Sequence, residues 1–199
     1  MPDSFGTLLI RRLDGRVALD DSQVAALERH YELLERWNRV LNLTSIRNLD
    51  DAVVRHYCEC LFFASLLPEE GRILDLGSGA GFPGIPIAIL RKGCEVSLLE
   101  SHKRKAVFLR EATRELPNVG VLAQRAEDLS GEWDILVSRA VNPMDVLNHV
   151  PGLSRRVGML VGDDFQRPPF QQIQWDEPTK LPWGDNRWAV FGMFHVEHP

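Results

Sequence analysis

Apolar residues in the first third of the chain recur at intervals of three and four positions, which is the spacing of one face of an α-helix. The first predicted helix follows candidate N-caps at residues 20–22, and its apolar face consists of Val24, Leu27, Tyr31, Leu34, Trp37 and Leu41. A second helix is predicted to begin near Asp50 and to end at Pro68, and its apolar face consists of Val53, Tyr57, Cys60, Ala64 and Leu67. Residues 1–68 are therefore expected to form a helical N-terminal extension.

The pattern changes between residues 71 and 162, where short apolar runs of strand length alternate with amphipathic segments. Strands are predicted at 73–76, 96–99, 119–122, 135–137 and 159–161. The stretch 102–116 has the spacing of an amphipathic helix. This alternation is typical of βαβ units, and so it predicts a parallel sheet with helices on both faces.

The last segment, residues 163–199, contains four of the twelve prolines. Two late strands are predicted there, at 170–175 and 188–196. Because no helical period separates them, we expect them to pair as an antiparallel hairpin at the edge of the sheet. The chain is thus expected to be a single α/β domain over residues 1–199, made of the helical extension and a core formed by residues 69–199.

Composition narrows the class of protein. With 199 residues, of which 44% are hydrophobic and 26% charged, the chain has the composition of a soluble globular domain. No apolar run approaches the roughly 20 residues that span a bilayer. The first residues lack the order of a secretory signal peptide, so a cytoplasmic location is expected. Three cysteines in such a chain argue against a disulfide framework.

The formal net charge of −5 is unusual for a protein that binds nucleic acid over its whole surface. It does not exclude a local basic surface. The run 102–105 contains Lys103, Arg104 and Lys105, and Arg110 and Arg114 follow on the same predicted helix. Such charges neutralise phosphates and make binding dependent on salt. The alternative interpretation is a solvated helix face.

The most informative segment is a strand that ends in a glycine-rich turn. The predicted strand 73–76 is followed by Gly77, Gly79 and Gly81, and a helix is expected after them. Glycine allows positive φ and lets a ligand approach the main chain closely. In an open α/β sheet, nucleotide-like ligands bind at the carboxyl ends of the strands. The turn is therefore a candidate nucleotide-binding loop.

The spacing of the glycines selects among nucleotide ligands. A dinucleotide fingerprint has the pattern G-x-G-x-x-G, whereas this loop has glycine at alternate positions. A P-loop requires Lys followed by Ser or Thr, which this turn lacks. The observed pattern D-x-G-x-G-x-G favours S-adenosyl-methionine, which has no pyrophosphate. The alternative interpretation is a tight turn in an enzyme whose ligand binds elsewhere.

Two acidic positions follow the glycine-rich turn. Glu100 ends the second predicted strand, 19 residues after Gly81, where a carboxylate can accept hydrogen bonds from both ribose hydroxyls of a nucleotide. The alternative is that Glu100 is an exposed N-cap of the helix that begins near His102. After the third strand, Ala126 and Glu127 offer backbone groups and a short acidic stretch that can meet the adenine edge.

Together these motifs resemble the RsmG (GidB) family of bacterial methyltransferases, which act on small-subunit ribosomal RNA. The resemblance rests on DLGSGAGFPGIPIAIL (Asp75–Leu90), LLES near residue 100, RAED (Arg125–Asp128) and SRA (Ser138–Ala140). Two upstream strings, WNRVLNLTSIRN (Trp37–Asn48) and RHYCECL (Arg55–Leu61), are similar to that family's helical N-terminal extension. The similarity covers roughly residues 20–165.

The resemblance implies a Rossmann-like class I methyltransferase fold, with a seven-stranded, mostly parallel sheet, an antiparallel edge strand and the helical N-terminal extension. It implies S-adenosyl-methionine as the cofactor and ring nitrogen 7 of a guanine in 16S ribosomal RNA as the methyl acceptor. The expected partner is 16S ribosomal RNA or the 30S subunit, bound by a monomer. The cofactor-binding residues expected from motif position are Gly77, Phe82, Ala126, Glu127 and Arg139, to which the sequence patterns add Gly79 and Glu100.

The implied chemistry requires no catalytic acid or base. Ring nitrogen 7 of guanine already carries an unprotonated lone pair, so positioning of the two reactants is the main contribution of the enzyme. An arginine can bind O6 and N7 of guanine together, and Arg139 is the candidate for this role or for the cofactor carboxylate. The alternative is an arginine that pairs with a neighbouring acid. Lys103 and Arg104 are further candidates for substrate binding, and Phe82 and Pro83 are expected to form apolar walls.

No metal site is predicted. Cys58 and Cys60 are two positions apart on a predicted helix and so face different directions, which favours core cysteines. His195 and His198, with Glu197 between them, lie at the C-terminal end, where disorder is common.

One departure from the family pattern, and several competing functions, stay open. Similar sequences tend to have Lys-Gly after the fifth strand, whereas this chain has Val161-Gly162-Asp163-Asp164. A small-molecule or protein methyltransferase, a non-catalytic ribosome-assembly factor with a methyltransferase fold, and a nicotinamide oxidoreductase are the alternatives. A thermal shift with adenosyl-methionine, or with NAD, separates the methyltransferases from the last two.

Overall fold

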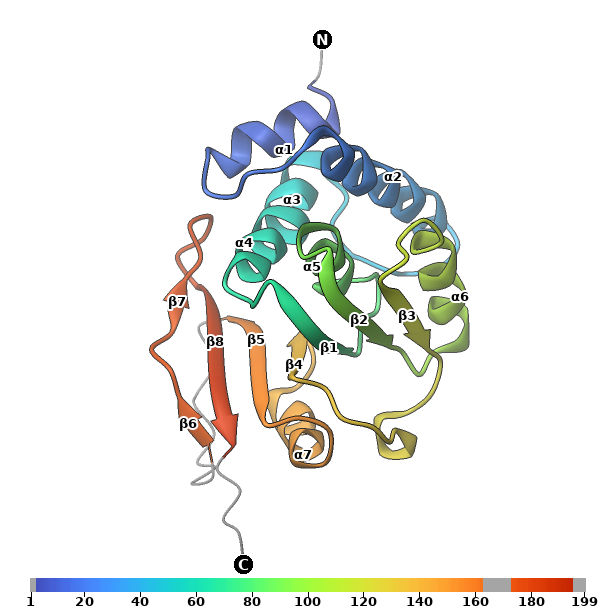
Figure 1. Ribbon diagram of the computed structural model, residues 1–199. Coiled ribbons are helices and arrows are strands. Elements are labelled where there is room, and N and C mark those ends of the chain that lie inside the picture. The colour runs from blue at the N-terminus through green and yellow to red at the C-terminus, as the bar shows by residue number, and fades with distance from the viewer. Residues whose placement is uncertain (1–2, 163–172, 195–199) are drawn as a thin grey trace, which may run out of the picture.

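The computed structural model describes residues 3–162 and 173–194, and the chain folds around one eight-stranded sheet (Figure 1). The strands are β1 (Glu70–Leu76), β2 (Gly93–Leu99), β3 (Val119–Leu122), β4 (Ile135–Arg139), β5 (Arg156–Gly162), β6 (Ile173–Trp175), β7 (Thr179–Lys180) and β8 (Arg187–Phe194). Their order across the sheet is β3-β2-β1-β4-β5-β8-β6, and β7 pairs with β8 outside this path.

The strand order creates a switch point beside β1. The five strands β1 to β5 are parallel, and β8 is antiparallel to β5, β6 and β7. From β1 the chain moves outward through β2 to β3, and it then returns to β4 on the other side of β1. Ligands of open α/β sheets bind outside the carboxyl ends of strands at such a point. The turn of residues 77–82, called the glycine loop below, follows β1 at this position.

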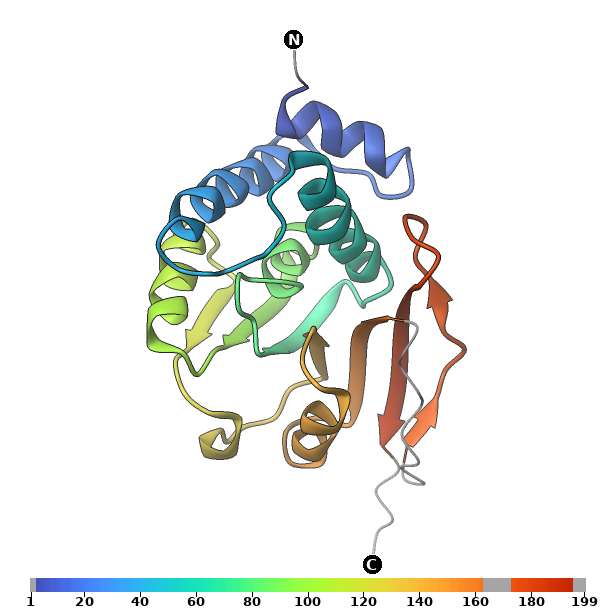
Figure 2. The ribbon, with the colours of Figure 1, turned by 180° about the vertical axis from the view of Figure 1, so that it is seen from behind.

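Helices cover both faces of the sheet. The elements before the sheet are α1 (Phe5–Leu13), α2 (Asp21–Asn38), α3 (Leu49–Ala52), the π-helix η1 (Val53–Cys58) and α4 (Glu59–Ser65). The connections between strands contain α5 (Gly84–Leu90), α6 (Lys103–Ala112), the 3-10 helix η2 (Ala126–Asp128) and α7 (Pro143–Leu153). The N-terminal helices lie with α5 and α6, while α7 lies apart from them beside β4 and β5, as the two opposite views show (Figures 1 and 2).

Two apolar clusters fill the space on either side of the sheet. Adjacent residues of a strand point to opposite faces, so Ile73 belongs to the first cluster and Leu74 to the second. The first cluster joins α1, α2 and α4 to α5 and α6, and it contains Leu27, Tyr57 and Phe108. The N-terminal extension therefore packs on the sheet through a shared core.

The predicted helices of the extension are confirmed, with different ends. The five predicted apolar positions from Val53 to Leu67 are all buried. Asp20 is the N-cap of α2, and it forms a capping box in which Gln23 donates to its carboxylate and accepts from its amide. The apolar pattern extends this helix to Leu41, but α2 ends at Asn38, whose side chain hydrogen-bonds the backbone of Leu43 and Thr44 instead.

Other features differ from the sequence prediction. Helix α1 was not predicted as a separate element, although its buried residues Phe5, Leu8, Leu9 and Leu13 have helical spacing and Ser4 is its N-cap. The π-helical turn η1 was not predicted either. The seven-stranded path is present, and the two-residue strand β7 adds an eighth strand through its pairing with β8. The late hairpin at the edge of the sheet is confirmed for the described residues, because β8 pairs antiparallel with β5 on one side and with the outermost strand β6 on the other. Residues 170–172 and 195–196 of the two predicted strands lie outside the described ranges.

No helix in the described ranges is long and apolar enough to cross a bilayer. The thiols of Cys58, Cys60 and Cys94 are free and buried, as the preference for core cysteines predicts.

Candidate cofactor-binding site

The glycine loop has a backbone that only glycine adopts readily. Gly77, Gly79 and Gly81 have φ angles of 75°, 57° and 90°, in the left-handed region. The amides of Gly77 and Ser78 both donate to the carbonyl oxygen of Leu99, at 2.9 and 3.0 Å, which fixes the loop to the end of β2. A Cβ built at Gly79 would meet only the carbonyl oxygen of Gly77, at 3.8 Å, so the main chain is open to a ligand there.

Glu100 lies directly against this loop. Its Oε2 accepts from the amide of Gly79 at 3.0 Å, and its Oε1 accepts from the amide of His102 at 2.7 Å. The alternative of an exposed N-cap is wrong, because Glu100 is 7% exposed and His102 is the N-cap of α6. Each carboxylate oxygen has a second lone pair, so the group remains able to accept from a hydroxyl.

Asp75, at the end of β1, is a second buried carboxyl group at the loop. Its Oδ2 accepts from the amide of Gly84 at 3.0 Å, while its Oδ1 is buried without a hydrogen-bond partner. Burial raises the pKa of Asp75 to about 7, since a charged carboxylate is disfavoured away from water. Asp75 thus contacts the start of α5, directly after the glycine loop, whereas Glu100 contacts the loop itself.

Phe82 does not form an open apolar wall, contrary to the sequence prediction. The residue is 7% exposed, and its ring is surrounded by the rings of three residues of the N-terminal extension. His56 stacks on it at 4.6 Å between centroids, with 12° between the planes, while His30 and Tyr57 approach at 5.2 and 5.3 Å. The aromatic side chain thus joins the loop to the extension, and its backbone remains in the loop.

His56 connects the extension to the loop and to Arg139. The Nε2 of His56 lies 2.8 Å from Thr44 Oγ1, and its Nδ1 lies 3.5 Å from a guanidinium nitrogen of Arg139. Because that guanidinium only donates, Nδ1 accepts and the ring proton lies on Nε2. Burial, followed by the positive charge of Arg139, lowers the pKa of His56 to about 3, so the ring is neutral.

Arg139, at the end of β4, pairs with an acid of the extension. Its guanidinium lies 3.4 Å from Glu59 Oε2, and Arg187 on β8 lies 2.9 Å from the same oxygen. The side chain of Glu59 is 2% exposed and that of Arg139 is 10% exposed. The alternative prediction, that Arg139 pairs with a neighbouring acid, is therefore confirmed by its contact with Glu59. Two guanidinium groups share one carboxylate, which leaves a net positive charge among the three.

The other predicted site residues lie around the same edge of the sheet. Ala126, on η2, packs against the second apolar cluster, which also contains Leu76 and Leu99 from the strand ends below the loop. Glu127 is exposed. Lys103 and Arg104 are exposed at the start of α6, directly after the His102 amide that binds Glu100. The structure brings Gly79 and Glu100 into direct contact, and it places the remaining candidates on the neighbouring elements.

Sequence reasoning missed His30 and Glu59 as site residues. A usable signal existed for His30, which is three positions after Leu27 and four before Leu34, on the apolar face of α2. Nothing comparable marks Glu59, because its two arginine partners are 80 and 128 residues away in sequence.

No group of three or more potential metal ligands occurs in the part of the chain that the structure describes. The C-terminal residues His195, Glu197 and His198 lie outside that part, as do Asp163 and Asp164. Val161, which precedes the altered family position, is buried in β5 and pairs with Trp188 of β8.

Comparison with known proteins decides the family. Residues 23–159 match the family GidB, described as rRNA small subunit methyltransferase G. The chain belongs to the GidB family. Ribosomal RNA small subunit methyltransferase G of Stenotrophomonas maltophilia is 40% identical over 162 residues, which are 79% of this chain and 76% of that protein. The protein of the same name from Dictyoglomus thermophilum is 31% identical over 91% of this chain and 79% of its own length.

Some GidB relatives match over a shorter stretch. The protein from Nitrosococcus oceani is 46% identical over 128 residues, and the chain spans 59% of its length. The corresponding share for the protein from Dichelobacter nodosus is 57%.

Solved structures confirm the methyltransferase fold. Magnesium protoporphyrin IX methyltransferase from Synechocystis PCC 6803, solved with bound SAM, has a TM-score of 0.63 over 89% of this chain and 99% of that chain, at 16% identity. The 23S rRNA methyltransferase ErmE has a TM-score of 0.52, covering 69% of this chain and 68% of that chain, at 15% identity. The Rossmann-like α/β fold inferred for this GidB member is therefore shown.

Proposed function

We propose that this GidB family member uses S-adenosyl-methionine to methylate ring nitrogen 7 of a guanine in 16S ribosomal RNA. The observation that carries the proposal is the contact between Glu100 and the amide of Gly79, at the switch point of a methyltransferase sheet. This contact supports a ribose-binding carboxylate beside an open, glycine-rich main chain. Family membership supports the RNA substrate.

The residues at the loop fit this cofactor. We assign cofactor binding to the glycine loop (Gly77, Gly79 and the backbone at Phe82), to Glu100, to Ala126 and Glu127, and to Arg139. The open main chain at Gly79 accepts close approach, and the carboxylate of Glu100 suits ribose hydroxyls. It also disfavours a ribose phosphate through like-charge repulsion, which argues against NADP-type ligands.

In this reaction the main role of the side chains is to orient the cofactor and the guanine. Bound S-adenosyl-methionine supplies a methyl group on a sulfonium, which is already an activated leaving group. Guanine nitrogen 7 carries a free lone pair, so no general base is assigned. Orientation of two reactants can supply about 7–11 kcal/mol of barrier reduction. The loop, Glu100 and Arg139 therefore act by holding the reactants in place and by excluding water.

We assign Arg139 to binding where the cofactor and the substrate meet. With Arg187 it shares the single carboxylate of Glu59, and the neighbouring imidazole of His56 is neutral, so the group retains positive charge. A guanidinium with free donors in such a group suits the cofactor carboxylate or the O6 and N7 acceptors of guanine.

We assign binding of the RNA phosphates to the basic residues at the start of α6. Lys103 and Arg104 are exposed next to the Glu100–His102 contact, so phosphates bound there lie beside the loop. We further propose that the protein is cytoplasmic. We propose that it acts as a monomer, on 16S RNA or on the 30S subunit.

The decisive experiment is transfer of a labelled methyl group from S-adenosyl-methionine to two substrates, purified 16S RNA and 30S subunits. The modified nucleoside is then identified by mass spectrometry, and 7-methylguanosine is the expected product. The arm that is labelled distinguishes naked RNA from the assembled subunit. Label found only on protein or on a small molecule would overturn the proposal. A thermal shift with NAD but none with adenosyl-methionine would favour an oxidoreductase.

A further inference from the structure

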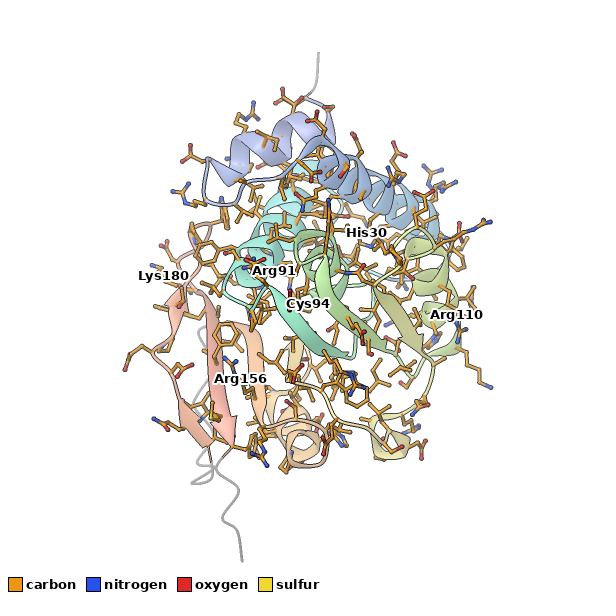
Figure 3. The ribbon with its side chains drawn as sticks, in the orientation of Figure 1. His30, Arg91, Cys94, Arg110, Arg156 and Lys180 are labelled. Carbon is orange, nitrogen blue, oxygen red and sulfur yellow. The ribbon has the colours of Figure 1, made fainter. Side chains whose placement is uncertain are left out.

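Helix α2 reaches the glycine loop through His30. This side chain is 2% exposed, and it lies beneath α2 on the side that faces α5 (Figure 3). Its Nε2 is 3.0 Å from the carbonyl oxygen of Ala80, which stands between Gly79 and Gly81 in the loop. His30 and Ala80 are 50 residues apart in sequence, so this hydrogen bond joins the N-terminal extension directly to the candidate site.

The partners of the two ring nitrogens determine where the proton of His30 lies. A carbonyl oxygen only accepts, so Nε2 carries the hydrogen that is donated to Ala80. The hydroxyl of Tyr57 lies 3.0 Å from Nδ1 and donates to it. Burial lowers the pKa of His30 to about 4, so the imidazole is neutral at physiological pH, as this arrangement requires.

The loop depends on such a contact because its own backbone is permissive. Gly79 and Gly81 flank Ala80 with positive φ angles, and glycine loses more conformational freedom on ordering than any other residue. Ala80 is 7% exposed, so loss of the imidazole would leave its carbonyl oxygen with an unmade hydrogen bond. The same imidazole packs against Phe82, which holds the loop at a second, adjacent point.

We propose that His30 is a positioning residue for the cofactor, which holds the glycine loop in its binding conformation by donating from Nε2 to the carbonyl of Ala80. The inference rests on the proposed function, since the loop must bind S-adenosyl-methionine for this positioning to affect the reaction. Tyr57 stabilises the required tautomer of His30, because its hydroxyl donates to Nδ1 and so leaves the ring proton on Nε2.

The test compares three variants of the full chain. His30→Phe keeps an aromatic ring against Phe82 but removes the donor, and His30→Gln restores an amide donor at a similar reach. Trp37→Phe is the matched control, because it removes a 3.0 Å hydrogen bond from α2 to Glu111 of α6, away from the loop. Two quantities are measured: the Kd for S-adenosyl-homocysteine by calorimetry without RNA, and hydrogen exchange of the loop amides without any ligand.

The expected pattern separates positioning from general stability. His30→Phe raises the Kd about tenfold and speeds exchange at the amides of Gly81 and Phe82, which both donate to Ser78. His30→Gln stays within about threefold of the unaltered protein, and Trp37→Phe changes neither quantity. Unchanged Kd and exchange in His30→Phe, or equal effects in Trp37→Phe, would overturn the inference.

A measurement on the unaltered protein makes the inference independent of how the variants fold. Nitrogen chemical shifts of the His30 ring are expected to show the neutral form with the proton on Nε2. A proton on Nδ1 overturns the inference directly. If the unaltered protein binds no S-adenosyl-homocysteine, the proposed function fails, whereas the exchange comparison still decides whether His30 holds the loop.

Discussion

Burial sets the charge state of the individual residues around the glycine loop. Asp75 has a pKa raised to about 7, and His56 has a pKa lowered to about 3, in both cases chiefly because the charged form loses its hydration. Glu59 is different, since two arginines compensate its buried charge. The titration of Asp75 and the pairing of Glu59 with Arg139 can therefore each be tested by mutation.

Asp75 is expected to make stability depend on pH. Its pKa rises from an ordinary value of 3.8 to about 7 on folding, so the folded chain keeps a proton that the unfolded chain has lost. Stability from this group is therefore present below about pH 4 and is lost progressively as the pH rises to about 7. Asp75→Asn removes the titration while it retains an acceptor for the amide of Gly84.

The measurement is urea unfolding of both proteins from pH 4.5 to 8. The free energy of unfolding of the original protein minus that of Asp75→Asn is expected to fall by about 1.4 kcal/mol per pH unit up to pH 7, and to be flat above it. A difference that does not change with pH would contradict the raised pKa.

Arg139→Ala is expected to lower methyl transfer at least tenfold while the fold survives. Glu59 would keep its contact with Arg187 at 2.9 Å, so its buried charge would not be left without a partner. The readouts are kcat/KM for labelled transfer and the midpoint of thermal unfolding. Arg16→Ala serves as the control, because Arg16 forms an exposed pair with Asp14. Turnover of Arg139→Ala at the original rate would refute the assigned role.

At the scale of secondary structure, helix ends are fixed by side chains from other elements. The last turn of α4 is an example: Arg91 Nε donates to the carbonyl of Ala64 at 2.9 Å, and its Nη2 donates to the carbonyl of Ser65 at 2.6 Å. The same guanidinium pairs with Glu69. Its side chain is 12% exposed and is visible beneath α4 in Figure 3. A positive charge also suits the carbonyl end of a helix.

Arg91→Met is therefore expected to lower the free energy of unfolding by about 2–4 kcal/mol, because it removes two charge-assisted hydrogen bonds to backbone carbonyls. The neighbouring variant Lys92→Met removes an exposed pair with Asp20, and it should cost no more than about 1 kcal/mol. Urea unfolding measures both. Equal effects of the two variants would show that Arg91 does not hold the end of α4.

At the scale of the whole molecule, the formal charge of −5 conceals an uneven distribution. Residues 102–110, which contain most of α6, have four Lys or Arg residues and no acidic residue, and Figure 3 shows Arg110 at the outer surface of this helix. An acidic total is thus compatible with RNA binding at one chosen surface. The N-terminal extension shares a core with the sheet, and the expectation of a single domain remains a prediction.

The double variant Lys103→Ala/Arg104→Ala is expected to bind 16S RNA more weakly. The slope of log affinity against log salt should decrease by about 1 for each phosphate that the variant no longer neutralises. Filter binding at several salt concentrations provides the slopes. Arg156→Ala/Lys180→Ala removes the same charge from exposed positions near β5 and β7, and it should leave the slope unchanged. An equal change of slope in both double variants would show that Lys103 and Arg104 act only through the net charge of the protein.

The features of this protein that depend on local pattern could be predicted from its amino-acid sequence. Alternating apolar runs predicted the five parallel strands, because a buried strand needs a continuous apolar stretch. Glycines at alternate positions predicted a tight turn after β1, and Gly77, Gly79 and Gly81 all adopt positive φ. The position of Glu100 at a strand end predicted its place beside the loop, because parallel strands end at one edge.

The side chains around that loop come from distant parts of the chain and could not be predicted from local pattern. His30 reaches Ala80 across 50 residues, and Arg187 reaches Glu59 across 128. The helical period places His30 on the apolar face of α2, but it does not show which distant residue the side chain contacts. That follows from how the N-terminal helices pack on the sheet. The same packing turned the ring of Phe82 away from the predicted ligand wall and into the extension. Local pattern thus fixed where the loop lies, and long-range packing fixed which side chains hold it.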